Sequence, residues 1–234
     1  MSETIKAYLT IDDITSDNTK AIIDYLCEKG IKVVLFAWGE RVENNPEPAI
    51  YALKKGMIIG NHSYSHPHFS ELSYEEGIAE IEKCEGVLNK LYKDAGVERK
   101  YRPFRFPYGD KGGVNKDAYQ KYFRENGFSK LDDREISLKY WAEEKLDKDI
   151  DTFWTFDFAE YGIRKGSDFT ENDVMNRINE FWSGFEDGTM SKDSNQFFLI
   201  HAHDETEELV PKYYRTFLDE VMSRGVHFVT PEFI

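Results

Sequence analysis

Residues that can act as acids, bases or metal ligands lie directly after segments that are typical of β-strands. They are Asp12, Asp13, His62, His66, Arg105, Asp157, Glu160 and His201. In a parallel barrel the carboxyl ends of the strands converge on one face, and that face carries the active site. We therefore expect these side chains to come together although they are far apart in the sequence.

Two imidazoles and a carboxylate make a suitable ligand set for a catalytic metal. His62 and His66 are four residues apart, so they share a face if the segment is a helical turn, whereas Pro67 equally favours a loop. With a carboxylate from Asp12 or Asp13 they could bind zinc and leave positions open for water and substrate. Cobalt, nickel or iron would suit the same ligands.

Arg105 lies between two phenylalanines, which predicts a partly buried guanidinium. It could pair with whichever of Asp12 and Asp13 does not bind the metal, and so keep that carboxylate ionised and oriented. Adjacent residues at the end of a regular strand point to opposite sides. One aspartate would then bind the metal while the other faces the substrate.

Strand-like and helix-like segments alternate along the whole chain. The expected strands are 5–11, 32–37, 57–60, 101–106, 152–156, 197–200 and 226–229. The expected helices are 17–29, 48–55, one that begins at 73, 116–125, 170–185 and 206–224. This alternation is typical of a parallel α/β protein, either a barrel or a doubly wound sheet. We expect a single domain over residues 1–234, with a charged insertion around 131–151.

Composition narrows the classes of function. The 234-residue chain has a formal net charge of −14 and 15% aromatic residues. Such a charge disfavours nucleic acid and anionic membrane surfaces as partners and suits a neutral or cationic substrate. No apolar run is long enough for a membrane span and no signal peptide is visible, so we expect a cytoplasmic protein.

The same residues fall within segments that resemble the motifs of the NodB-homology polysaccharide deacetylases, carbohydrate esterase family 4. Residues 10–13, TIDD, resemble the first motif, and residues 60–67, GNHSYSHP, resemble the second. Residues 104–109, FRFPYG, resemble the third, and residues 199–201, LIH, the fifth. Where the family usually has an Asp-Trp pair as its fourth motif, residues 160–161 are Glu-Tyr with Asp157 nearby, which leaves open whether Glu160 or Asp157 tunes His201. The resemblance implies a distorted (β/α) barrel with seven or eight parallel strands.

The resemblance also implies a role for each residue. Asp12 would be the general base, held by Arg105, and His201 the general acid. The metal ligands would be Asp13, His62 and His66, with zinc as the first choice of divalent metal. The backbone N–H of Tyr108 would help to stabilise the oxyanion. The substrate would be bordered by Pro107, Asp157, Glu160, Tyr161 and Leu199, the last of which would line the acetyl pocket.

The function implied is removal of acetyl groups from N-acetylated amino sugars or oligosaccharides. A second hypothesis within the same superfamily is hydrolysis of a cyclic amide or ureide. A third is a carbohydrate-binding protein without activity, which the intact base and metal ligands disfavour. His203-Asp204 offers an alternative to His201 as the terminal histidine, and Ile14 stands where the family usually has glycine.

Overall fold

Five strands form one parallel path, and a sixth strand pairs with the first. The computed structural model describes residues 4–234. The strands are β1 Ile5–Ile14, β2 Val33–Ala37, β3 Ile58–Asn61, β4 Phe156–Asp157, β5 Gln196–His201 and β6 Val226–Phe228. Their order is β3-β2-β1-β5-β4, β6 also pairs with β1, and every one of these pairings is parallel. The expected parallel α/β fold is confirmed.

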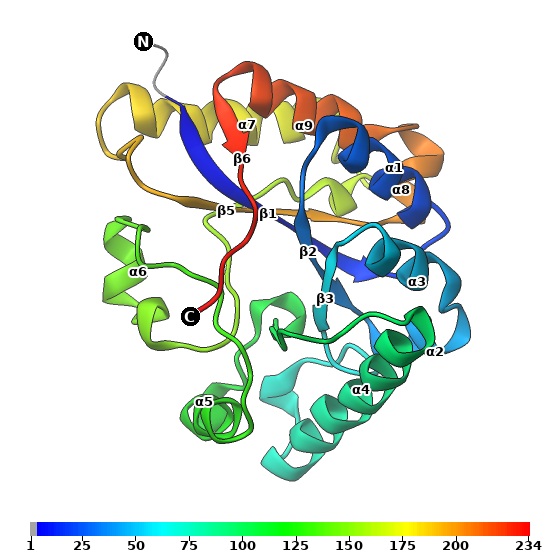
Figure 1. The fold of residues 1–234 in the computed structure, drawn as a ribbon. Coiled ribbons are helices and arrows are strands. Elements are labelled where there is room, and N and C mark those ends of the chain that lie inside the picture. Colours follow the sequence, from blue (N-terminus) through cyan, green and yellow to red (C-terminus); the bar gives the residue numbers. More distant parts are fainter. Residues whose placement is uncertain (1–3) are drawn as a thin grey trace.

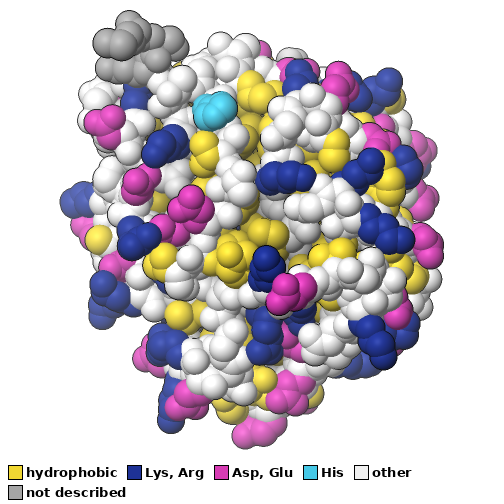
Figure 2. Space-filling model, in the orientation of Figure 1, with side chains coloured by type: hydrophobic (Ala, Val, Ile, Leu, Met, Phe, Trp, Pro, Cys, Tyr) yellow, Lys and Arg dark blue, Asp and Glu magenta, His cyan; other side chains and the backbone are white. Residues whose placement is uncertain are grey.

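Helices surround the sheet (Figure 1). They are α1 Thr19–Lys29, α2 Gly39–Asn44, α3 Glu47–Lys54, α4 Tyr74–Ala95, α5 Lys116–Glu125, α6 Lys139–Glu143, α7 Glu171–Glu186, α8 Asp204–Leu209 and α9 Tyr213–Ser223. In residues 4–234 no helix combines the length and the apolar character needed to cross a lipid bilayer. On the face shown in Figure 2, acidic and basic side chains are interspersed, so the net negative charge is not gathered there into a single patch.

Extended segments, rather than full strands, lie between β3 and β4. The strand expected over 101–106 is reduced to a bridge between Asn61 and Phe104. Single backbone hydrogen bonds join this segment to its neighbours on both sides. Arg105 N–H donates to Asn61 O of β3 at 3.0 Å, and Thr152 N–H donates to Phe104 O at 2.8 Å. Proline has no N–H to donate, and prolines at 103 and 107 keep this segment from pairing as a full strand. The described residues therefore contain six strands, with extended segments where further strands were expected.

The two-residue period of the strands sorts their side chains between two faces. One face of β1, β2 and β5 packs into the main core. On the other face β1 and β5 bring three pairs into register, which are Tyr8 with Phe197, Thr10 with Leu199 and Asp12 with His201. Apolar side chains near the amino ends of the strands thus give way to chemically active side chains at their carboxyl ends.

Residues 131–151 cover the end of the sheet that lies away from those active side chains. Leu138 and Trp141 of this segment pack with Tyr8 and Phe197 in a separate apolar cluster. The backbone oxygen of Glu135 accepts the N–H of the residue that precedes β5, at 2.9 Å. The expected charged insertion is therefore a plug at the amino end of the strands.

Two helix predictions need correction. The helix expected over 206–224 is divided into α8 and α9, because Pro211 interrupts it. Proline cannot donate a backbone hydrogen bond and disfavours helical geometry in the residue before it, and Val210 indeed has φ −132° and ψ 84°. The short helix α2 was not expected at all. It matters below because it carries Arg41.

Candidate active site

Asp12 and Asp13 reach the same cleft because the end of β1 is irregular. The pairing of β1 with β2 shifts its register between Ile11 and Ile14. Asp13 has φ 65°, in the left-handed region that few residues other than glycine adopt. An irregularity of this kind redirects a side chain. Both carboxylates therefore line one cleft, although a regular strand would send them to opposite faces.

The two histidines of the expected metal site come from a loop after β3, not from a helix. Ser63 and His66 in this loop have φ 62° and 61°. Glu80 of α4 holds the loop, because its carboxylate accepts the N–H of Ser65 at 2.7 Å and that of Tyr64 at 3.1 Å. Left-handed backbone at residues other than glycine persists where the surroundings impose it, and it clusters at functional sites.

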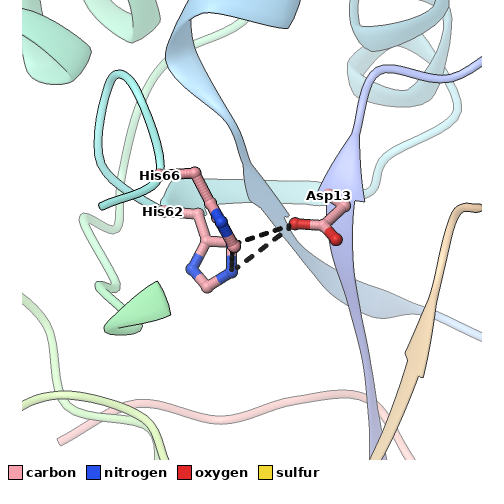
Figure 3. A group of neighbouring side chains, drawn as sticks. All are labelled: Asp13, His62 and His66. Atoms are coloured by element: carbon pink, nitrogen blue, oxygen red, sulfur yellow. Dashed lines mark hydrogen bonds and ion pairs between the residues drawn. The ribbon is translucent and has the colours of Figure 1, made fainter. Parts of the chain in front are cut away.

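Asp13, His62 and His66 have the geometry of a metal site (Figure 3). His62 Nε2 and His66 Nε2 are 3.3 Å apart. Asp13 Oδ1 lies 3.8 Å from His62 Nε2 and 3.3 Å from His66 Nε2. Ligand atoms at about 2.1 Å around a tetrahedral zinc ion lie about 3.4 Å from one another. Asp13 Oδ1 is buried without a hydrogen-bond partner among the described residues, as an oxygen reserved for a cation would be. These residues fit a divalent metal.

His62 is prepared for such a role by its surroundings. Its Nδ1 lies 2.8 Å from the backbone oxygen of Arg105, so Nδ1–H donates and the Nε2 lone pair faces the cleft. Burial is the main cause that lowers the pKa of His62, to about 4. The imidazole is therefore neutral at ordinary pH, as a metal ligand must be.

Arg105 is 1% exposed, and each nitrogen of its guanidinium donates a hydrogen bond. Nη1 donates to Asp12 Oδ1 at 2.8 Å and to Thr10 Oγ1 at 2.9 Å. Nε and Nη2 donate to the backbone oxygens of Thr152 and Phe153. A buried ion pair is tolerated when hydrogen bonds satisfy the remaining donors. Arg105 therefore fixes the orientation of the Asp12 carboxylate from behind the cleft.

His201 is paired with Glu160, whose side chain is completely buried. Glu160 Oε1 accepts the backbone N–H of His201 and lies 3.2 Å from His201 Nδ1. Burial acts to lower the pKa of His201, but the negative charge and hydrogen bond of Glu160, with help from Asp157, raise it to about 10. Burial also raises the pKa of Glu160, so the pair competes for a proton. We assign that proton to His201, because Oε1 faces two N–H groups that favour the carboxylate form.

His203 occupies a different position from His201. Its Nδ1 accepts the N–H of Thr206 at 3.3 Å and so caps α8. No carboxylate in the described part of the chain forms an ion pair with it. Because only His201 has a buried carboxylate behind it, this geometry favours His201 over His203 as the acid.

Tyr108 stands at the rim of the cleft with 59% of its surface exposed. It has φ 59°, and its N–H has no acceptor among the residues that the structure describes. Its ring stacks on that of His68 at 4.0 Å and meets the edge of His66 at 4.6 Å. The free N–H is available to an oxygen that becomes negative during a reaction.

A single cleft of about 260 Å³ joins these groups. The predicted residues that line it are Asp12, Asp13, His62, His66, Tyr108, Asp157, Tyr161, Leu199 and His201. Pro107 and Glu160 were expected to contact substrate, but both are buried and neither lines the cleft. Glu160 instead supports His201, and Pro107 is the buried first residue of the turn Pro107–Gly109, which presents Tyr108.

Three residues that line the cleft were missed by sequence reasoning, namely Arg41, Trp154 and Arg164. The sequence could have pointed to Trp154, because it is an aromatic residue near the end of the expected strand 152–156. Nothing in the sequence pointed to Arg41 or Arg164, since each is a single arginine within a charged, irregular stretch. Trp38 also lines the cleft and stacks on His66 at 4.6 Å.

The family model for polysaccharide deacetylases matches residues 2–129, which is more than half of the chain. The chain belongs to the polysaccharide deacetylase family. The matched region holds the first three motifs, with Asp12, Asp13, His62, His66 and Arg105. The Glu160–His201 pair lies beyond it, so its assignment depends on the geometry described above.

Named deacetylases match less than half of the chain. Chitin deacetylase 1 of Cryptococcus neoformans is 41% identical over 103 residues, which is 44% of this chain and 21% of that protein. A peptidoglycan-N-acetylglucosamine deacetylase of Bacillus cereus is 36% identical over 103 residues, again 44% of this chain and 36% of that protein. The match thus spans about a fifth and about a third of these relatives.

Solved structures of the family share the fold over nearly the whole chain. One is a peptidoglycan N-acetylglucosamine deacetylase with a TM-score of 0.66 and 22% identity, where the match covers 98% of this chain and 87% of the other. Another is a polysaccharide deacetylase from Bacillus cereus, with a TM-score of 0.64, 21% identity and coverage of 97% and 91%. The second half of the chain therefore also has the fold of the family.

Proposed function

We propose that this protein removes acetyl groups from N-acetylated amino sugars or oligosaccharides with the help of a bound divalent metal. The observation that carries the proposal is the convergence on one cleft of the Asp12 carboxylate, the Asp13, His62 and His66 cluster, and His201. The relatives named as deacetylases of chitin and of peptidoglycan N-acetylglucosamine support this substrate class.

The described residues suit each step of amide hydrolysis. A cation held by the Asp13 cluster, zinc before cobalt, nickel or iron, would supply Lewis acidity to the acetyl carbonyl and to the attacking water. Asp12, oriented by Arg105, accepts the proton of that water. The Tyr108 N–H donates to the oxygen of the tetrahedral intermediate. His201 then gives its proton to the leaving nitrogen, and Leu199 packs against the acetyl methyl group.

The proposal is tested by acetate release from short N-acetylglucosamine oligomers. Protein stripped of metal should release no acetate, and added zinc or cobalt should restore release. The Asp13→Ala variant serves as the matched control, because added metal should not rescue it. Stoichiometric metal binding without any acetate release would contradict the proposed function.

A further inference from the structure

Two arginines line the cleft without an acidic partner. Within residues 4–234, neither Arg41 nor Arg164 forms an ion pair with a carboxylate. The chain has 44 acidic and 30 basic residues, so acidic partners are plentiful. Two unpaired guanidinium groups at the same cleft therefore point to an acceptor that the chain itself does not supply.

Arg41 of α2 is held in place beside the metal ligands. Its guanidinium carbon lies 4.0 Å from the centre of the Trp38 ring, and Trp38 in turn stacks on His66. Its Nη1 donates to the backbone oxygen of Asp13 at 3.1 Å. Stacking and this hydrogen bond orient the planar guanidinium and leave its other N–H groups free to bind a ligand.

Arg164 follows the turn Glu160–Gly162 and lines the same cleft as Arg41. The acidic groups near Arg164 bind its neighbour Lys165 instead. Lys165 Nζ pairs with Glu208 at 2.7 Å, and the N–H of Lys165 donates to Glu205 at 2.9 Å. Arg164 is exposed and is left with no side-chain partner in the described chain.

The carboxylates deeper in the cleft have other partners. Asp12 is bound by Arg105 at 2.8 Å, and Asp13 faces the two histidine ligands. Asp157 accepts the N–H of Ala159 at 2.8 Å. The two arginines are therefore not counterions of the catalytic groups, and an anion that binds them must come with the ligand.

We propose that Arg41 and Arg164 form an anion subsite, and that the substrate is an acetylated amino sugar that carries a carboxylate or phosphate substituent. This inference rests on the proposed deacetylase function. A guanidinium presents a planar fork of N–H donors that matches either oxyanion with two hydrogen bonds. The chain's net charge of −14 repels an anion at long range. Salt screens that field over about 10 Å at 0.1 M, so the local arginines dominate inside the cleft.

Binding is measured by calorimetry with the zinc-loaded Asp12→Asn variant of the full chain. The ligands are three N-acetylglucosamine oligomers of equal length, one neutral, one with carboxylate substituents and one with phosphate substituents. We expect an anionic oligomer to bind roughly tenfold more tightly than the neutral one. Whether carboxylate or phosphate gives the larger gain identifies the natural substituent.

Arg164→Gln in the same background should remove most of this preference. Arg124→Gln is the matched control, because Arg124 in α5 is also exposed and without an ion pair but lies outside the cleft. It should keep the preference. Arg41→Gln also releases the backbone of Asp13, so its readout is the ratio of the two affinities rather than either affinity alone.

Equal affinity for neutral and anionic oligomers would overturn the anion subsite. So would a preference that survives Arg164→Gln, or one that Arg124→Gln removes to the same extent. Acetate release from all three oligomers by the wild-type protein is measured in parallel. Release without any anionic preference refutes the subsite alone, whereas no release from any oligomer refutes the proposed function on which it rests.

Discussion

At the scale of single residues, left-handed backbone directs three groups into the cleft. Asp13, His66 and Tyr108 have φ between 59° and 65°. Such a conformation costs on the order of 1–3 kcal/mol for a residue other than glycine, and it persists only where surrounding contacts impose it. Here it brings one carboxylate, one imidazole and one free N–H to the same cleft.

Asp12→Asn should abolish turnover while leaving metal binding intact. The amide oxygen can still accept from Arg105 Nη1, which lies 2.8 Å from Oδ1, but the amide cannot take a proton from water. Loss of a general base lowers kcat by about 10²- to 10⁴-fold. Acetate release and a zinc titration check this, with Asp94→Asn on the surface of α4 as the control. Near-normal kcat in Asp12→Asn would show that another group is the base.

Glu160→Gln should move the alkaline limb of kcat/KM to lower pH. The charge of Glu160 outweighs burial and raises the pKa of His201 to about 10, so without that charge burial lowers this pKa. The protonated acid is then lost at a lower pH. Asp157→Asn should shift the limb less, since Asp157 contributes less than Glu160. An unchanged alkaline limb in Glu160→Gln would exclude His201 as the acid.

At the scale of elements, one buried lysine joins the segments that carry Tyr108 and support Arg105. Lys111 Nζ lies 2.8 Å from Asp149 and 2.8 Å from Asp151. Residues 152 and 153, directly after this pair, supply the backbone oxygens that bind Arg105. The positions of Tyr108 and of the Asp12 carboxylate are therefore linked through one ion-pair network.

Lys111→Met should destabilise the protein by about 3 kcal/mol, because it leaves the buried Asp151 carboxylate without its cation, whereas Asp149 keeps Lys116 at 3.0 Å. The Lys111 side chain is only 12% exposed, so solvent cannot compensate for the loss. Urea denaturation measures the free energy of unfolding, and kcat should fall as well. Lys121→Met, which removes an exposed pair, should change stability by less than about 0.5 kcal/mol. Equal stability losses for the two variants would mean that the network has no special role.

At the scale of the whole molecule, the cleft and the apolar plug lie at opposite ends of the strands. The cleft lies at the carboxyl ends of β1 and β5, while residues 131–146 close the amino ends. Trp141 is buried in that plug, and its Nε1 donates to Asp133 at 3.0 Å. The plug supports the strands without contributing a residue to the lining of the cleft.

Trp141→Ala should therefore lower the free energy of unfolding by about 3–5 kcal/mol, as expected for truncation of a large buried side chain. At a temperature where the variant stays folded, kcat and KM should remain near their wild-type values. Tyr140→Ala, at a partly exposed neighbour, should be much milder. A large fall in kcat of folded Trp141→Ala would show that the two ends are coupled.

The order of segments, the parallel α/β class and the main site residues could be read from sequence, because they depend on short-range patterns. The capping box at Ser73 predicts the start of α4. Asp12, Asp13, His62 and His66 lie within recognisable motifs. Tertiary packing decided where the charged insertion lies, at the amino ends of the strands. The shortened strand near Pro103 and the break of the last helix at Pro211 have a local cause, because proline cannot donate a backbone hydrogen bond.

Within the site, sequence named the residues but not all of their positions. The sequence indicated Glu160 as a substrate contact and left open whether Glu160 or Asp157 acts on His201. In the structure Glu160 lies behind His201, a long-range contact that no local pattern encodes. Arg41 and Arg164 became visible only when the chain brought them to one cleft without acidic partners. Residue chemistry is local and can be read along the chain. Which charges remain unpaired depends on every neighbour in space, and only the tertiary structure decides that.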